Sequence, residues 1–119
     1  MSRYLSLVLV AFASLASNAE AFEFSNLKRN ESKAGTVRFA RPTGQYSLLP
    51  GETLKSVRLI YTISSSTVPA TSAGQFTTNP NTWNTGVGDV ALRTYKVEFV
   101  VRRNGQDTKI TTQTFTYGQ

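Results

Sequence analysis

The sequence of 119 residues contains no cysteine and no histidine, and only seven of its residues are acidic. Without cysteine the chain has no disulfide, no thiol nucleophile and no thiolate to bind a metal. Without histidine it lacks the side chain that most often transfers protons near neutral pH and that binds most transition metals. These absences predict a protein with no catalytic residues, no cofactor and no metal site.

The few acidic residues are also poorly placed for catalysis. A two-carboxylate hydrolase needs two of them to converge across a cleft. Glu98 and Asp107 instead lie in predicted strands beside cationic residues, where ion pairing is the simpler interpretation. Asp89 stands alone in the segment TGVGDV, whereas a calcium loop needs several oxygen ligands close together. We therefore expect that the protein is not an enzyme.

The first 21 residues have the pattern of a secretory signal peptide. Arg3 precedes a mainly apolar stretch, residues 5–16, and the small residues Ala19 and Ala21 form a cleavage site. A helix that spans a bilayer needs about 20 residues, so this stretch is too short, and no second such stretch follows. The alternative is an uncleaved membrane anchor. The sequence predicts a signal peptide over residues 1–21 and one domain over residues 22–119. This domain is expected to be extracytoplasmic, meaning periplasmic, secreted or at the cell surface, and not membrane-spanning.

Cations outnumber acids in the chain, with 13 lysines and arginines and a formal net charge of +6. Cleavage after Ala21 removes Arg3 and Glu20, so the mature chain keeps this net charge. A basic exported protein can bind an anionic envelope or extracellular polymer. Its cations can equally serve only to keep the protein soluble. Nucleic acid is not an expected partner, because export separates the protein from it and no aromatic residues are interleaved with the cations for base stacking.

After residue 21 the composition favours strands over helices, since threonine, serine, valine, tyrosine and phenylalanine dominate. The segment SVRLIYTIS, residues 56–64, alternates most clearly, with the odd-numbered residues 57–63 on one face and Arg58 on the other. In GTVRFAR, residues 35–41, Val37 and Phe39 share the face expected to be buried, and Arg38 points to solvent. The sequence predicts an all-β fold of antiparallel strands in two stacked layers.

The segment from Tyr95 to Tyr117 predicts a hairpin. Asn104 and Gly105 tolerate positive φ, as a two-residue type I′ turn requires. Pairing outward from this turn places residue 102 opposite 107, 99 opposite 110, 97 opposite 112 and 95 opposite 114. In that register Phe115 and Tyr117 fall on the outer face, so either a β-bulge turns them inward or another segment covers them. The bulge is the preferred interpretation.

A long connection rich in serine, threonine and asparagine spans residues 64–84. Unstructured loops of this length are uncommon within a compact domain, so we expect a short edge strand near residues 75–77 or a functional role. Phe76 and Trp83 are the only aromatic residues of this connection. Trp83 either caps the core from the loop or is exposed as an anchor for a partner, and both residues are candidates for partner binding.

The start of the last hairpin carries a family resemblance. In the segment DVALRTYKVEFVVRRNG, Leu92 and Thr94 lead into Tyr95, which opens a core strand, and TTQTFTY follows. This pattern resembles the last hairpin of fibronectin type III and related immunoglobulin-like modules. The resemblance implies a small immunoglobulin-like antiparallel β-sandwich. It also implies a tyrosine corner, in which the Tyr95 hydroxyl bonds to backbone a few residues upstream. It implies no function, because such sandwiches host unrelated activities.

The cations of the predicted strands are the remaining candidates for a site. If the alternation holds, their side chains point outward and several share one sheet face: Arg38, Arg58, Lys96, Arg102 and Lys109. We therefore expect an exported, non-enzymatic binding or adhesion module that holds a protein or an anionic polymer on this basic face and on the long loop. The alternatives are a structural subunit of a surface fibre or coat that self-associates through edge strands, and a periplasmic inhibitor or chaperone-like protein.

Overall fold

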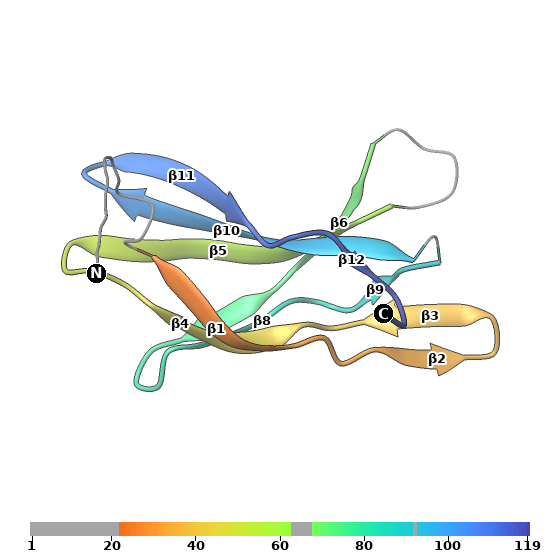
Figure 1. Cartoon of the computed structure of the whole chain (residues 1–119). Coiled ribbons are helices and arrows are strands. Elements are labelled where there is room, and N and C mark those ends of the chain that lie inside the picture. Colours follow the sequence, from red (N-terminus) through yellow and green to blue (C-terminus); the bar gives the residue numbers. More distant parts are fainter. Residues whose placement is uncertain (1–21, 63–67, 92) are drawn as a thin grey trace, which may run out of the picture.

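The computed structural model describes residues 22–62, 68–91 and 93–119, and these residues form strands without any helix (Figure 1). All strand pairs are antiparallel, so the all-β prediction is confirmed. The predicted signal peptide, Ile63, residues 64–67 and Leu92 lie outside the described residues. The strands in chain order are β1 (Glu23–Lys28), β2 (Ser32–Ala34), β3 (Val37–Ala40), β4 (Thr43–Ser47), β5 (Glu52–Tyr61), β6 (Ala70–Ala73), β7 (Gln75–Thr77), β8 (Thr82–Asn84), β9 (Gly88–Asp89), β10 (Thr94–Arg103), β11 (Gln106–Thr111) and β12 (Phe115–Thr116).

The strands lie in two layers. The first layer is one long sheet with the order β11-β10-β5-β6, to which β12 adds by pairing with β10. The second layer holds two smaller sheets, β1-β4-β8-β7 and β2-β3-β9. In Figure 1, β11, β10 and β5 run along one side of the molecule, and the smaller sheets lie end to end on the other.

The second layer is a long sheet that is interrupted at its middle. Arg41 and Pro42 separate β3 from β4, and residues 85–87 separate β8 from β9. Backbone hydrogen bonds still cross the interruption, from the Thr85 N–H to the Pro42 carbonyl at 3.0 Å and from the Arg41 N–H to the Arg29 carbonyl at 3.3 Å. The chain thus keeps its direction through the interruption, although its ladder pairing stops there.

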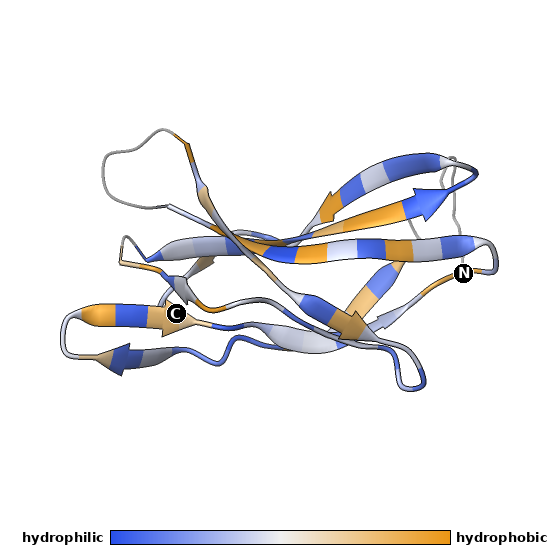
Figure 2. Ribbon diagram, turned by 180° about the vertical axis from the view of Figure 1, so that it is seen from behind, coloured by the Kyte–Doolittle hydropathy of each residue, from blue (hydrophilic) through white to orange (hydrophobic). Residues whose placement is uncertain are grey.

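Two clusters of buried side chains fill the space between the layers. Strands β5 and β10 pair from Tyr61 opposite Tyr95 to Glu52 opposite Arg103, and both contribute to each cluster. Figure 2 shows hydrophobic and hydrophilic residues alternating along the long strands, as burial of one face requires. The first cluster contains Phe22, Tyr46, Leu54, Val57, Trp83, Val97, Phe99 and Val101. The second contains Ala40, Leu59, Val90 and Tyr95, with Tyr61, Phe115 and Tyr117 packed against it.

The hairpin near the end of the chain has the predicted turn and, near that turn, the predicted register. Asn104 has a φ of 53° and Gly105 a φ of 77°, as a type I′ turn requires. Residue 102 pairs with 107 and residue 99 with 110, as predicted. Further from the turn the register shifts by one, so Tyr95 pairs with Phe115 and the predicted partner, residue 114, is wrong. This shift is an irregularity of the kind expected there, which turns Phe115 inward. It brings the centre of the Phe115 ring to 5.6 Å from the centre of the Tyr95 ring.

The long connection contains more strand than the sequence indicated. The edge strand expected near residues 75–77 is β7, at the edge of the sheet β1-β4-β8-β7, and β6 and β8 flank it. Trp83 on β8 is 1% exposed, and its indole N–H donates to the Gln45 carbonyl at 3.0 Å. Its ring meets Phe99 edge to face at 5.1 Å. Trp83 is therefore a core residue, and its side chain is not exposed as an anchor.

The two faces of β3 are opposite to those expected. Ala40 is fully buried in the second cluster, and Arg38 lies on the same side of the strand because side chains two residues apart share a face. The Arg38 guanidinium lies 5.9 Å from the centre of the Tyr117 ring. The prediction that Arg38 points outward is wrong. The alternating pattern alone does not say which face is buried, and here the small Ala40 fits beneath β5 and β10 while Phe39 lies outside.

Candidate functional site

Four of the predicted basic residues share the outer face of the long sheet. Arg58 on β5 pairs with Glu98 on β10, and Lys109 on β11 pairs with Val100 on β10. Lys96 and Arg102 are spaced by even numbers of residues from these β10 positions, so their side chains lie on the same face. This arrangement confirms that several of these cations share a face, although Arg38 is not among them.

Lys55 is a fifth cation of this face that the sequence analysis missed. It is the extra residue at the register shift between β5 and β10, next to the buried Leu54. Its charge acts on Asp107, which pairs with Arg102 on the outer face. A register shift cannot be located by alternation, so only the structure could place Lys55. We refer to Lys55, Arg58, Lys96, Arg102 and Lys109 together as the basic sheet face.

Two acids on this face form ion pairs with its arginines. The Arg58 Nε donates to Glu98 at 2.7 Å, and Glu98 is 6% exposed although it lies on the outer side. Arg102 donates to both carboxylate oxygens of Asp107, at 2.7 and 3.2 Å. The hydrogen bond from Arg102, with the charges of Arg102 and Lys55, holds the pKa of Asp107 below its usual value. The ion pairing predicted for both acids is confirmed.

The lysines of the basic sheet face have no such partners. Within the described ranges, every ion pair shorter than 4.0 Å involves an arginine. Lys55, Lys96 and Lys109 therefore keep their charges open to a partner. Five cations and two acids give this face a net charge of +3.

The two aromatic candidates lie elsewhere. Phe76 on the edge strand β7 is 36% exposed and meets Tyr46 edge to face at 6.4 Å. It pairs with the buried Trp83, so it lies at the rim of the inner side of the second layer. The structure thus brings four of the seven candidates together and leaves Arg38, Phe76 and Trp83 apart from them.

A hollow of about 650 Å³ lies on the outer face of the second layer, where that layer is interrupted. Residues of three separate segments line it, and no local sequence pattern indicates it. We call it the outer hollow and define it by Asn30, Phe39, Arg41, Thr43, Asn84 and Val87.

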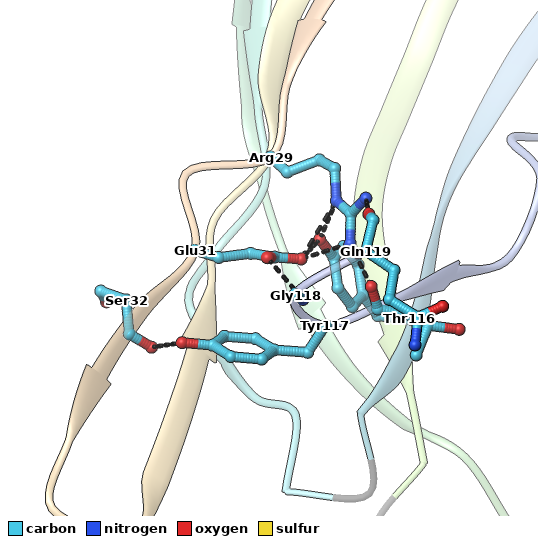
Figure 3. Close-up of polar contacts among 8 residues, drawn as sticks. Arg29, Glu31, Ser32, Thr116, Tyr117, Gly118 and Gln119 are labelled. Carbon is cyan, nitrogen blue, oxygen red and sulfur yellow. Dashed lines mark hydrogen bonds and ion pairs between the residues drawn. The ribbon is translucent and has the colours of Figure 1, made fainter.

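A polar cluster fastens the end of the chain to the segment between β1 and β2 (Figure 3). Arg29 donates to Glu31 and to the carbonyls of Thr116 and Gln119. Glu31 also accepts the Gly118 N–H at 2.9 Å and the hydroxyl of Tyr95. Burial opposes ionisation of Glu31, but the hydrogen bonds from Tyr95, Gly118 and Arg29 outweigh it and lower the pKa of Glu31. The polar groups of the cluster bond to one another, so the role of the cluster is structural: it holds residues 116–119 against the segment between β1 and β2.

This cluster replaces the tyrosine corner that the family resemblance implied. The Tyr95 hydroxyl donates to the Glu31 carboxylate and accepts a hydrogen bond from the Arg29 Nε at 2.8 Å. Both partners are side chains more than 60 residues earlier in the sequence. Burial and the hydrogen bond to Glu31 raise the pKa of Tyr95. The expectation of a bond to nearby upstream backbone is therefore wrong.

The described residues contain no helix of the length and apolar character needed to cross a membrane. Among the same residues no group of three or more acidic side chains is placed to hold a metal ion. Comparison with known proteins found no matching family model, no similar curated protein and no similar solved structure.

Proposed function

We propose that this protein is an exported, non-enzymatic binding module that holds an anionic polymer of the cell envelope or extracellular space on its basic sheet face. The observation that carries the proposal is the gathering of Lys55 and four predicted cations on one face with a net charge of +3. This face holds five of the twelve cations that follow residue 21 and half of the net charge of +6 of that part of the chain. Its three lysines have no carboxylate within 4.0 Å among the described residues, so they are free to bind an anion.

The form of the face favours a polymer over a small ligand. The first layer presents an extended sheet, and Lys109 on β11 and Arg58 on β5 lie on either side of β10. A row of cations on such a surface attracts a polymer with regularly spaced negative charges. Binding then releases the counterions of the polymer, which favours the complex. The three lysines contribute most, because Arg58 and Arg102 already have carboxylate partners.

We also infer that the two layers are an immunoglobulin-like sandwich. The support comes from strand order. If β1 with β2, β3 with β4, and β8 with β9 are each counted as one interrupted strand, one layer has the order A-B-E-D and the other contains C-F-G, the immunoglobulin order. In this comparison β7 is D, β5 is C, β10 is F and β11 is G. The inference rests on this order and not on Tyr95, whose contacts differ from a tyrosine corner.

The proposed function is tested by salt-dependent binding to immobilised heparin and to purified envelope polymer. The variant Lys96→Gln/Lys109→Gln removes two charges from the basic sheet face. Each lost contact to a polyanion removes roughly one unit from the slope of log affinity against log salt, so the slope should fall by about two.

A second variant serves as the matched control. Lys28→Gln/Lys33→Gln removes the same charge from exposed positions on β1 and β2, in the other layer. Its slope should equal that of the unmodified protein. An equal loss in both variants would mean that only net charge matters, and the proposal of a dedicated face would be abandoned.

A further inference from the structure

We infer that the outer hollow is a separate binding site and that its ligand is a short acidic saccharide, a sugar chain bearing carboxylates. The site lies on the layer opposite the basic sheet face, so it does not depend on the proposed function. It rests on three features of the hollow: an outward row of side chains, a fixed carboxamide and an apolar wall beside a guanidinium.

The first feature is a row of three alternate residues whose side chains point outward: Phe39, Arg41 and Thr43. Between them, Ala40 and Pro42 are buried and Gly44 packs on the inward-facing Trp83 ring. The alternation continues through the interruption, where Pro42 is buried between the exposed Arg41 and the half-buried Thr43. The row therefore presents an aromatic ring, a cation and a hydroxyl side by side.

The second feature is the Asn30 side chain, which two hydrogen bonds hold in place. Its Nδ2 donates to the Arg41 carbonyl at 3.0 Å and to the Thr43 hydroxyl oxygen at 3.1 Å. Both amide protons are thereby used, which leaves the Asn30 Oδ1 as an acceptor and the Thr43 hydroxyl proton as a donor. Asn84, which pairs with Thr43 across the strands, adds a second carboxamide on the same face. These groups match the hydroxyls of a sugar, which both donate and accept.

The third feature is an apolar wall with a positive charge beside it. Val87 is 52% exposed in the interruption, and the half-buried Phe39 lines the same hollow. A pyranose ring has an apolar C–H face that packs on such surfaces, and buried apolar area contributes to binding. Arg41 is exposed and has no carboxylate within 4.0 Å among the described residues. A guanidinium binds a carboxylate through two parallel hydrogen bonds, which selects a sugar acid over a neutral sugar.

The position of the hollow disfavours an acidic peptide. Strands β3 and β4 have neighbours on both sides, β2 and β9 for the one and β1 and β8 for the other. An extended peptide gains affinity by pairing its backbone with a free strand edge, and β3 and β4, which carry most of the hollow, have none free. Of the edge strand β2 only Ser32 lines the hollow, which is too short an edge for an extended peptide to pair with. The volume of about 650 Å³ falls within the range of small-ligand sites and accommodates a short saccharide.

The test is a titration of the isotope-labelled protein with trigalacturonate, followed by amide chemical shifts. Saturable shifts are expected at residues 30, 39–43 and 84–87. Arg41→Gln should weaken this binding about tenfold, the effect of losing a hydrogen-bonded charge partner. The unmodified protein should bind maltotriose, a neutral trisaccharide, no more tightly than the variant binds trigalacturonate.

Controls separate the inference from the proposed function. Arg93→Gln removes the same charge from an exposed loop position and should bind like the unmodified protein. Lys96→Gln/Lys109→Gln should also keep the shifts at the hollow. Shifts confined to the basic sheet face, equal binding of maltotriose, or equal binding of a triglutamate peptide would each overturn the inference.

Discussion

At the scale of single residues, Glu31 determines how the end of the described chain is held. One of its oxygens accepts hydrogen bonds from Arg29 and Tyr95, and the other accepts the Gly118 N–H. The side chain is 17% exposed, so water replaces these bonds poorly when one is lost. No sequence pattern connects Arg29 and Glu31 to Tyr95, because the contact exists only once the two layers have packed.

The lowered pKa of Glu31 makes its contribution to stability depend on pH. A carboxyl whose folded pKa lies below its usual value of 4.5 stabilises the fold above that pH, and the stabilisation disappears as the pH falls through the folded pKa. Glu31→Gln should lower the free energy of unfolding at pH 7 by about 1–3 kcal/mol, the effect of removing a hydrogen-bonded charge. Urea denaturation at pH 7 and at pH 3 measures this difference, which should shrink at the lower pH.

Glu23→Gln is the control for this experiment, because Glu23 is exposed on β1. It should leave the free energy of unfolding nearly unchanged at both pH values. If the two variants behave alike, or if the cost of Glu31→Gln does not change with pH, the polar cluster contributes nothing through ionised Glu31.

At the scale of elements, alternation predicted where the strands lie, but it did not predict which face of β3 is buried or where the register shifts. The hairpin at Asn104 and the edge strand β7 followed from turn chemistry and loop length. The buried face of β3 did not follow, because GTVRFAR has apolar residues on both faces and only packing chooses between them. The register shift after β11 was anticipated, but its position depends on a hydroxyl contact that sequence does not reveal.

That contact is made by Thr112, between β11 and β12. The Thr112 hydroxyl oxygen accepts the buried Val97 N–H at 3.0 Å, and the Thr112 N–H donates to the Val97 carbonyl at 2.9 Å. The side chain thus takes the place of the ladder bond that the irregularity removes. Phe115 can then turn toward Tyr95 without leaving a buried donor unsatisfied.

Thr112→Val keeps the shape of this side chain but removes the acceptor. The Val97 N–H would then be buried without a partner, so the free energy of unfolding should fall by about 1–3 kcal/mol and the Val97 amide should exchange with deuterium faster. Thr112→Ser restores the hydroxyl and should recover the slow exchange. Thr111→Val, at an exposed neighbouring position, should change neither quantity. Unchanged exchange at Val97 in the Thr112→Val variant would show that another group satisfies this amide.

At the scale of the whole molecule, the two layers present different surfaces. The long sheet carries the basic sheet face, four of whose five cations sequence alternation identified. The second layer carries the outer hollow, which no local pattern could indicate because Asn30, Arg41 and Asn84 meet only through strand pairing. Periodic surfaces are thus readable from sequence, whereas sites built at an interruption are not.

The long strands also determine how the molecule should unfold. Strands β5 and β10 contribute side chains to both buried clusters, so neither cluster can open without disturbing their pairing. Leu59 is fully buried in the second cluster, whereas Trp83, the single tryptophan, lies in the first.

Leu59→Ala should lower the free energy of unfolding by about 2–5 kcal/mol. If unfolding is cooperative, the midpoint followed by Trp83 fluorescence should fall by as much as the midpoint followed by far-ultraviolet circular dichroism. A tryptophan midpoint that stayed in place while the circular dichroism midpoint fell would mean that the two ends of the molecule unfold separately.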